Sequence, residues 1–413
     1  MANLIPGEIS GWEDFSLKEK PALTIFSKRF HVALILTCAS MTQVGVPPTA
    51  FSQSRDPEAV QKAREEAVRA KTEKAFYSNQ FDLSGIAPYR PEQKVSGTIR
   101  IWGDDHKVNF VKGWEQGFRQ FEPDVTFEYH MKTTEQAIPG LYTQRADIGV
   151  MGRQIMWDEL LAYQRQFDHP PLEISVATGS YNVSGWTFAL GIFVNKQNPI
   201  SQLTMKQLDG IFGAERSGGW KGLEWDESAA RGPDQNIRRW GQLGLTGEWA
   251  DKPIHVYGFT TKYHFPDEFE KKVFHGGSKW NENLKEYANR TGEYGRFIVA
   301  GEDMMADLSN DPYGIAYGGM PYLTSKTKSL AIAAKEGERY VSLTIENVQN
   351  RTYPLTRDDY FYVTREPGRP LDPKIKEFIR YVLSRDGQEY VMKNGKNLPL
   401  TAGFDREQLG KLD

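Results

Sequence analysis

Three consecutive side chains, Asp104, Asp105 and His106, carry groups that bind metal ions or transfer protons. Their carboxylate and imidazole groups could ligate a divalent cation, or a carboxylate beside the histidine could activate water in a phosphatase or other hydrolase. No second cluster at metal-ligand spacing accompanies them, and the sequence contains no Gly-x-Ser-x-Gly, His-Glu-x-x-His or phosphate-loop motif. The sequence therefore predicts no metal ligand and no catalytic residue, and an enzyme is the less favoured alternative.

Other side chains could bind a ligand or could serve only the structure. Arg153 could pair with an anion, or it could be one partner of a surface salt bridge. Tyr263 and His264 could face a ligand, or they could pack and cap at the start of a helix. Four tryptophans could stack on a sugar, but packing is the favoured interpretation; they are Trp220, Trp225, Trp240 and Trp249.

The overall charge excludes one large class of partners. The formal net charge is −3 and the sequence pI is about 6.2, so no broad positive field attracts nucleic acid or an acidic membrane. Any anion must be held by local geometry. Cys38 is the only cysteine, which excludes an intrachain disulfide and a cysteine metal cluster.

The N-terminal region has the pattern of a secretory signal peptide. Lys28 and Arg29 precede an apolar run, and Ala50-Phe51-Ser52 forms a cleavage site before Gln53. We therefore expect residues 1–52 to be an N-terminal extension and signal peptide, with the signal near 28–52, and the mature protein to be exported to the periplasm or another extracytoplasmic site. The alternatives are a buried helix of the mature fold and, less favoured, lipidation at Cys38.

The elements that must position these side chains alternate along the chain. Residues 53–92 are predicted to be a charged spacer helix, from Asp56 to Lys74, and a linker. Strands and helices then alternate, which indicates an α/β fold with largely parallel sheets. The predicted strands are Val95–Trp102, Val125–Tyr129, Ala146–Val150, Trp186–Asn195, Pro253–Tyr257 and Tyr360–Thr364, and the predicted helices are Val108–Phe121, Thr204–Phe212 and Asp372–Ser384.

The segment Phe193 to Gly213, FVNKQNPISQLTMKQLDGIFG, resembles a signature of the phosphate-type periplasmic substrate-binding proteins of ABC transporters. In it an Asn-Pro turn precedes a helix capped by Thr204. Further matches follow in order at Trp240–Gly244, Pro253–Gly258, Tyr313–Gly318, Tyr353–Thr356 and Pro367–Asp372, and the similarity extends from Val95 to about Leu400.

This resemblance implies the type II periplasmic-binding-protein architecture: two lobes, each a mixed, mostly parallel sheet flanked by helices, joined by two hinge crossovers. The expected boundaries are 93–185 for the first part of lobe 1, 186–353 for lobe 2 and 354–413 for the C-terminal part of lobe 1. A small phosphate-like anion would bind between the lobes without a cofactor or metal, and closure would be a hinge motion. The expected partner is an ABC transporter permease, and the expected state is a monomer.

The resemblance also carries the family's ligand positions onto particular residues, where this chain departs from the family pattern. Asp105 and His106 stand where a hydroxyl and a backbone amide are expected, and Gly152 stands where the family has a proton-accepting aspartate. The remaining candidates are Thr133 and Thr134 in the second site loop, Arg153 beside Gly152, and Lys262, Tyr263 and His264 before a helix in lobe 2. Pro266 is expected at the first position of that helix.

These departures leave the ligand open. Without the aspartate, the site lacks the acceptor that separates a protonated phosphate from a fully ionised sulfate, whereas Arg153, with Lys132 and Lys262 possible nearby, restores positive charge. Phosphate or a similar oxyanion is the first expectation. A different small anion or organic ligand, or a sensor or adhesion module on the same fold, is the alternative.

Overall fold

A computed structural model describes Tyr77 and residues 80–183, 187–293 and 296–413. All of them fall within one compact unit, Arg55–Asp413. The predicted signal peptide and the spacer helix at Asp56–Lys74 lie outside the described residues. No helix of the described part is long and apolar enough to cross a bilayer.

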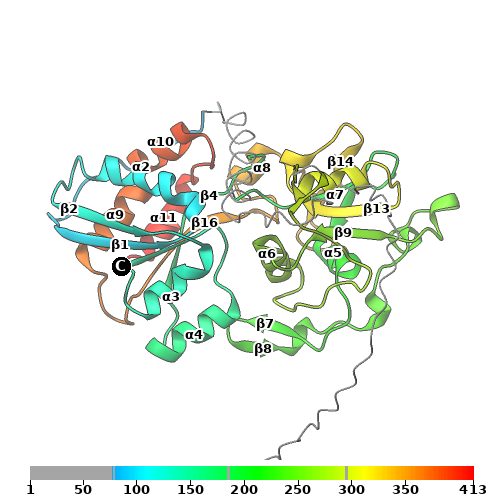
Figure 1. The fold of residues 1–413 in the computed structure, drawn as a ribbon, viewed down its shortest axis with the longest axis horizontal. Coiled ribbons are helices and arrows are strands. Elements are labelled where there is room, and N and C mark those ends of the chain that lie inside the picture. The colour runs from blue at the N-terminus through cyan, green and yellow to red at the C-terminus, as the bar shows by residue number, and fades with distance from the viewer. Residues whose placement is uncertain (1–76, 78–79, 184–186, 294–295) are drawn as a thin grey trace, which may run out of the picture. The chain divides into compact units, whose positions relative to one another are not determined.

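The first sheet has the strand order β2-β1-β3-β16-β4 (Figure 1). Its strands are β1 (Gly97–Gly103), β2 (Val125–His130), β3 (Ile148–Met151), β4 (Leu172–Thr178) and β16 (Asp358–Val363). β1 pairs in parallel with both β2 and β3, whereas β16 is antiparallel to β3 and β4. We call this sheet and its helices lobe 1. It combines an N-terminal and a C-terminal part of the chain.

Helices cover both faces of this sheet, as Figure 1 shows. They are α2 (Val108–Phe118), α3 (Ala137–Tyr142), α4 (Trp157–Phe167), α9 (Pro373–Leu383), α10 (Arg385–Asn394) and α11 (Ala402–Gly410), with the 3-10 turns η1 (Asp105–Lys107) and η2 (Thr134–Gln136) at the starts of α2 and α3. On one face Trp114 of α2 is fully buried, and its Nε1 donates to the carbonyl of Gly387 at 3.0 Å. On the other face, α3 and α4 enclose a smaller core around Leu141 and Tyr163.

The second sheet has the strand order β10-β9-β13-β5-β14 and forms, with its helices, lobe 2. Its strands are β5 (Gly191–Asn195), β9 (His255–Phe259), β10 (Lys285–Tyr287), β13 (Gly314–Gly318) and β14 (Thr327–Ser329). β10, β9 and β13 are parallel, and β5 is antiparallel to its two neighbours. Both sheets are therefore mixed with a parallel group of three, as the α/β prediction required.

The remaining elements of lobe 2 surround this sheet. They are α5 (Met205–Phe212), α6 (His264–Val273), α7 (Ala300–Leu308), α8 (Ile345–Gln349), β6 (Gln202–Thr204), β7 (Gly219–Lys221), β8 (Glu224–Asp226), β11 (Arg290–Thr291), β12 (Phe297–Ile298) and β15 (Ala331–Ala333), with 3-10 turns η3 (Glu227–Ala229), η4 (Pro233–Gln235), η5 (Trp240–Leu243), η6 (Gly247–Trp249) and η8 (Met320–Tyr322). Trp240 is completely buried here and donates through Nε1 to the carbonyl of Tyr313 at 3.1 Å. The packing interpretation is therefore right for this tryptophan.

Two chain segments connect the lobes, one from β4 to β5 and one from α8 to β16. They lie side by side, because the N–H of Gly179 donates to the carbonyl of Arg357 at 2.8 Å and the N–H of Leu190 donates to that of Leu355 at 3.0 Å. This pairing also corrects one prediction. Trp186, where the strand was expected to begin, lies outside the described residues, and β5 begins only at Gly191, since the N–H of Ala189 donates to the carbonyl of Ser180 in the crossing.

Helix starts follow the local sequence closely. Thr204 caps α5 by accepting the N–H of Gln207 at 3.1 Å, and Oε1 of Gln207 accepts the N–H of Thr204 at 2.8 Å. The prediction for Pro266 is wrong by two positions, because α6 begins at His264. Proline is tolerated there because the amides of a first helical turn have no partner within the helix.

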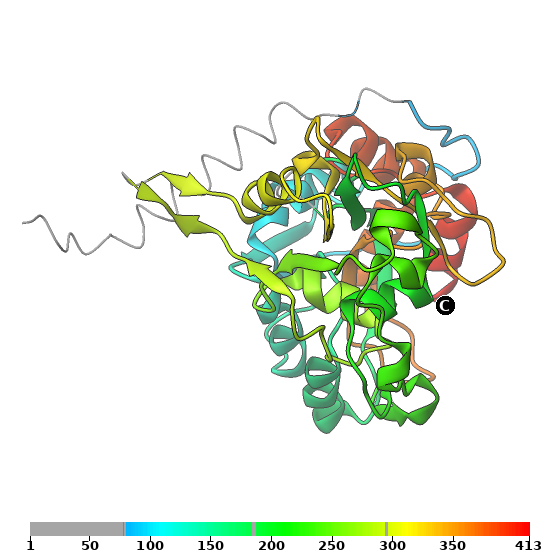
Figure 2. The same ribbon diagram turned by 90° about the vertical axis from the view of Figure 1, so that its right-hand side faces the viewer.

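Figure 2 shows the molecule from the side of lobe 2. The hairpin β7–β8 lies in the segment inserted before β9, and its Trp220 stacks on Trp157 of α4 with ring centroids 5.2 Å apart and an angle of 11°. Trp225 of the hairpin is 46% exposed and packs edge-on against Trp220. The inserted segment therefore joins lobe 2 to a helix of lobe 1.

Candidate ligand-binding site

A cavity of about 470 Å³ lies between the two lobes. Lobe 1 lines it with residues that follow β1, β2 and β3, and lobe 2 lines it with residues that follow β9 and β10 and with the start of α7. The carboxyl ends of parallel strands are where open α/β sheets bind ligands, because loops from neighbouring strands converge there. Eight of the nine predicted ligand residues line the cavity: Asp105, His106, Thr133, Thr134, Gly152, Lys262, Tyr263 and His264.

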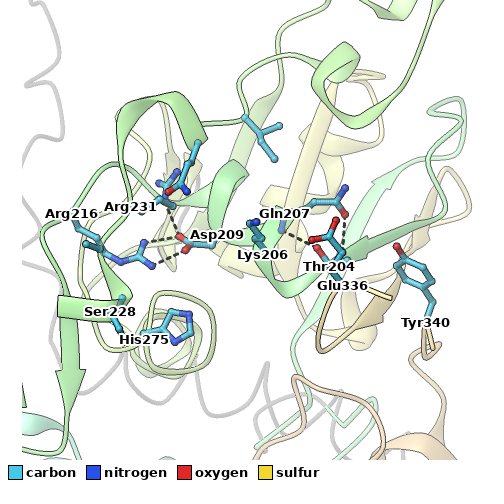
Figure 3. A pocket seen from close by; sticks show the side chains of 14 residues that line it. Thr204, Lys206, Gln207, Asp209, Arg216, Ser228, Arg231, His275, Glu336 and Tyr340 are labelled. Atoms are coloured by element: carbon cyan, nitrogen blue, oxygen red, sulfur yellow. Dashed lines mark hydrogen bonds and ion pairs between the residues drawn. The ribbon is translucent and has the colours of Figure 1, made fainter. Parts of the chain in front are cut away.

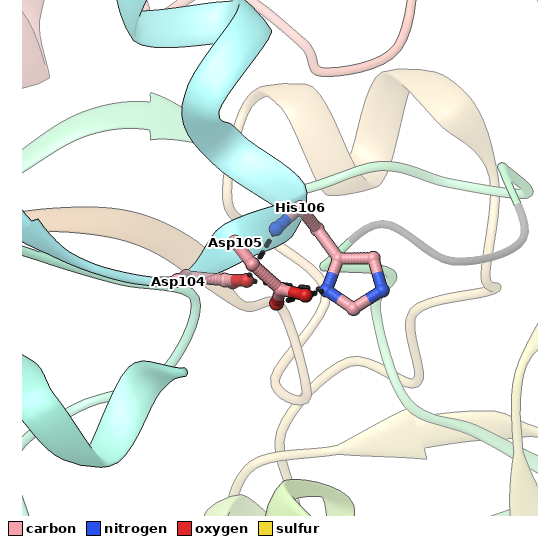
Figure 4. Close-up of side chains that lie close together, drawn as sticks. All are labelled: Asp104, Asp105 and His106. Atoms are coloured by element: carbon pink, nitrogen blue, oxygen red, sulfur yellow. Dashed lines mark hydrogen bonds and ion pairs between the residues drawn. The ribbon is translucent and has the colours of Figure 1, made fainter. Parts of the chain in front are cut away.

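The three side chains of the Asp-Asp-His sequence point toward one another (Figure 4). The backbone N–H of His106 donates to Oδ1 of Asp104 at 3.0 Å, and its ring Nδ1 lies 3.3 Å from that oxygen and 3.0 Å from Oδ1 of Asp105. Hydrogen bonds to Asp104 and Asp105 raise the pKa of His106 to about 10, although burial acts to lower it. The imidazole is therefore protonated at neutral pH.

Candidate metal-ligand atoms of these three residues all lie within 4.8 Å of one another. A cation bound there would compete with the proton on Nδ1, because a protonated imidazole has no lone pair for a metal at that nitrogen. The arrangement as it stands is an imidazolium between two carboxylates. It gives this end of the cavity hydrogen-bond acceptors as well as positive charge.

A buried ion pair supports the same wall from behind. Nζ of Lys107 lies 2.8 Å from Oδ2 of Asp359, and both side chains are only 2% exposed. Asp359 also accepts hydrogen bonds from Thr187 and from Nδ2 of Asn397, each at 2.8 Å. Burial raises the pKa of Asp359, against the lowering effect of Lys107. This network fixes the start of α2 against the crossing that leads into β16.

Arg357 brings a guanidinium to the cavity from the crossing itself. The residue is 3% exposed, and its Nη2 donates to the carbonyl of Gly152 at 3.0 Å. Its guanidinium lies 5.2 Å from the centre of the Phe265 ring, and Nε has no hydrogen-bond partner within the described residues. Burial lowers the pKa of Arg357, and the nearby carboxylate of Glu268 opposes that shift.

Gly152 is glycine because its surroundings leave no room for a side chain. A Cβ at this position would lie 2.6 Å from Oγ1 of Thr187 and 3.3 Å from Oδ2 of Asp104. The space where the family pattern has an aspartate side chain is therefore occupied by Thr187 and by the carboxylate of Asp104. Burial acts to raise the pKa of Asp104, but the hydrogen bonds of His106 and the charge of Lys107 lower it overall.

The second loop of lobe 1 offers one hydroxyl that is not used locally. Thr133 donates its hydroxyl to the carboxylate of Glu135. Thr134, at the start of η2, is 5% exposed and lines the cavity beside Lys132. Glu135 also reaches across to lobe 2, since its Oε1 lies 3.2 Å from Nε2 of His264.

Arg153 lies beside the cavity rather than in its lining. Its Nη1 and Nη2 donate to the two carboxylate oxygens of Glu159 at 2.7 and 2.8 Å, and its Nε donates to Nδ1 of His264 at 3.2 Å. Burial acts to lower the pKa of Arg153, but the carboxylate of Glu159 raises it overall. Arg153 lines a smaller neighbouring pocket of about 290 Å³ together with Lys262, Tyr263 and His264. In this arrangement it is a salt-bridge partner that also joins the two lobes.

Another cavity, of about 430 Å³, lies within lobe 2 (Figure 3). Asp209 accepts two hydrogen bonds from Arg216, at 2.7 and 2.6 Å, and lies 3.3 Å from Nε of Arg231. Arg231 also donates to Asn236 at 2.8 Å. These charges hold the inserted segment to α5, and the interlobe cavity remains the better candidate site.

The sequence of the chain also matches known proteins. The model of the PBP superfamily domain matches residues 89–386. The chain belongs to the PBP superfamily. Within this superfamily it is 32% identical over 334 residues to the phosphate-binding protein PstS of Pseudomonas aeruginosa, which covers 80% of this chain and 93% of that protein, and it thus belongs to the PstS family.

Solved structures of PBP-superfamily proteins are more distant in sequence. A crystal structure of PstS from Borrelia burgdorferi is 15% identical and covers 75% of this chain and all of that chain, with a TM-score of 0.48. A possible phosphate-binding protein from Planctomyces limnophilus is 20% identical and covers 77% and 98% of the two chains, with a TM-score of 0.45.

Sequence reasoning missed four residues of this PBP-superfamily site: Asp104 as a cavity carboxylate, the pair Lys107 and Asp359, and Arg357. Asp359 and Arg357 lie more than 200 residues beyond the loops that they approach. One signal was present, because Arg357-Asp358-Asp359 puts three charges directly before the apolar strand at Tyr360. Charges that enter a buried strand indicate a paired network.

Proposed function

We propose that this protein captures phosphate or a similar small oxyanion between its two lobes and delivers it to an ABC importer. The observation that carries the proposal is the buried guanidinium of Arg357 in the wall of the interlobe cavity, with its Nε without a partner in the described part of the chain. Buried donors of this kind bind an anion without a large reorganisation cost. The PstS relative supports the oxyanion class.

The surrounding residues have distinct roles in this proposal. Thr134 donates its hydroxyl, and Lys132 and Lys262 add positive charge at the edge of the cavity. Protonated His106 orders Asp104 and Asp105, which accept hydrogen bonds from the ligand. Because Gly152 has no side chain, it leaves room beside it for the carboxylate of Asp104. Tyr263 and His264 form the opposite edge, and Arg153 contributes by holding His264.

The same proposal includes the setting of the protein. We infer that it is exported by the signal near residues 28–52, that it acts as a monomer, and that its partner is a transporter permease. It acts by binding, and no catalytic step is required. An export assay of a fusion carrying residues 1–60 tests the signal, and light scattering of the purified protein tests the monomer.

The binding claim is tested by isothermal titration of the purified protein with inorganic phosphate and with sulfate. We expect phosphate to bind and Arg357→Met to weaken it by about 10-fold or more, since a hydrogen bond to a charged group contributes about 1.5–3 kcal/mol. Arg365→Met is the matched control, because Arg365 donates to the carbonyl of Lys411 and lies outside the cavity lining. If neither phosphate nor sulfate binds, the proposal is refuted.

A further inference from the structure

The walls of the interlobe cavity differ in chemistry. Lobe 1 contributes mainly charged and hydroxyl side chains, whereas lobe 2 contributes a group of rings as well as Lys262, His264 and Asn289. These rings, which we call the aromatic wall, are Phe188, Phe259, Tyr263, Phe265, Phe297 and Tyr322. A bare tetrahedral oxyanion has no apolar surface with which to contact them.

The aromatic wall is packed into a defined shape. Phe265 stacks on Phe188 with ring centroids 4.9 Å apart and lies 4.6 Å from Phe259, and Tyr322 meets Phe188 edge-on at 6.0 Å. Phe188 and Phe259 are almost fully buried and anchor the wall in the core of lobe 2. Rings held in this way lose little conformational entropy when a ligand packs against them.

The cavity is also larger than inorganic phosphate requires. Its volume of about 470 Å³ has room for several water molecules. A five-atom oxyanion replaces only a few of these and leaves the aromatic wall in contact with water. Cavities of about 300–1,000 Å³ with an apolar lining are typical of sites for larger organic ligands.

Three cations near the cavity interact with carboxylates of the protein, whereas Lys132 and Lys262 line its edge. Lys107 is paired with Asp359, and His106 is held between Asp104 and Asp105. Arg357 interacts with the charge of Glu268. Part of the positive charge is thus compensated within the protein, and contact with the aromatic wall would add to the hydrogen bonds of the oxyanion.

From these observations we propose that the ligand is an organic phosphoryl or phosphonyl compound, whose oxyanion group faces lobe 1 and whose compact apolar body packs on the aromatic wall. This inference rests on the proposed function and refines it to a substrate class. The oxyanion group takes donors from Arg357 and Thr134. The body lies against Phe265 and Phe297.

The test is a titration of the full-length mature protein with inorganic phosphate, methylphosphonate and phenylphosphonate. We expect phenylphosphonate to bind at least about 10-fold more tightly than phosphate, because burial of a ring removes a large apolar area from water. Methylphosphonate is expected between the two. Phosphate binding as tight as that of phenylphosphonate would overturn the inference and leave the proposed function intact, whereas no binding of any of the three would overturn both.

Variants of the aromatic wall test whether its rings contribute to the binding of phenylphosphonate. Phe297 is half-buried and lies in the short strand β12, so Phe297→Ala removes a wall ring without opening the main core. We expect the ratio of phosphate to phenylphosphonate dissociation constants to fall by about 3- to 10-fold. Leu323→Ala, an exposed apolar residue outside the cavity lining, is the control and should leave the ratio unchanged. An unchanged ratio in Phe297→Ala and in Phe265→Leu would exclude the wall as a binding surface.

Discussion

At the residue scale, the buried pair of Lys107 and Asp359 has the clearest energetic consequence. Two charges at 2.8 Å with 2% exposure are stable only together, because the loss of one leaves the other desolvated and unpaired. Lys107→Met should therefore lower the free energy of unfolding by about 3–5 kcal/mol. Urea denaturation measures this change.

The double variant Lys107→Met, Asp359→Leu separates this cause from a general packing defect. Replacement of both partners removes the uncompensated charge, so a substantial part of the lost stability should return. If the double variant is less stable than Lys107→Met alone, the pair is not the origin of the effect.

Asp405 predicts a pH dependence at the same scale. The residue is 1% exposed, its Oδ1 has no partner among the described residues, and burial raises its pKa to about 7, although Arg406 acts to lower it. Because this value exceeds the ordinary 3.8, the folded state favours the protonated form, and stability from this group is lost as the pH rises from about 4 to 7.

Asp405→Asn should remove that loss. We expect the variant to be about 1 to 4 kcal/mol more stable than the parent protein at pH 8, with a smaller difference at pH 5. Thermal unfolding at the two pH values measures this. Asp234→Asn, at an exposed position, is the control. If Asp405→Asn changed the stability by the same amount at pH 5 and at pH 8, Asp405 would not be the source of the pH dependence.

At the element scale, the hairpin β7–β8 and helix α4 meet through two tryptophans from different lobes. The stack of Trp157 on Trp220 exists only while the lobes are close together, so it stabilises the closed arrangement. An aromatic pair contributes about 0.5–1.5 kcal/mol beyond area burial. Trp220→Ala should therefore raise the apparent dissociation constant by about 2- to 12-fold, because the closed state becomes less populated.

A double-mutant cycle tests the coupling. Trp157→Ala alone should have a similar effect, and the two substitutions together should cost less than the sum of the single ones. Titration calorimetry with the tightest of the three oxyanions provides the constants. Strict additivity would show that the two rings act independently.

At the scale of the whole molecule, polar contacts across the cavity connect the hinge to the lobes. Oε1 of Glu268, on α6 of lobe 2, accepts the N–H of Gln154 of lobe 1 at 2.7 Å, and its charge faces Arg357 on the crossing. Burial acts to raise the pKa of Glu268, but Arg357 and two lysines lower it overall, so the carboxylate is ionised at neutral pH. This one side chain links both lobes and a crossover.

Glu268→Gln keeps the shape and removes the charge. We expect a loss of about 1–3 kcal/mol in stability, since Arg357 loses its compensating carboxylate. Added salt should restore little of this loss because the groups are buried. Melting temperatures at low and high salt check the prediction, with exposed Glu338→Gln as the control. If high salt restored the full stability of Glu268→Gln, the charge of Glu268 would be acting through solvent-exposed groups and not through buried ones.

Local sequence patterns were enough to predict most of the helices and strands and the family. Alternating apolar residues predicted β1 and β2, helical spacing predicted α2 and α9, and Thr204 predicted the start of α5, because these signals are local. The order of short motifs from Phe193 to Asp372 indicated the PBP architecture. The sequence also indicated loops that line the cavity between the lobes.

The contacts that those loops make depend on the folded chain. It placed Arg153 on Glu159, filled the space at Gly152 with Asp104, and brought Arg357 and Asp359 to a loop far away in sequence. Such pairings depend on which charges become buried together, and burial results from the packing of both sheets and both crossings. Local patterns contain no record of these distances, so charge compensation in the cavity emerges only when the chain is folded.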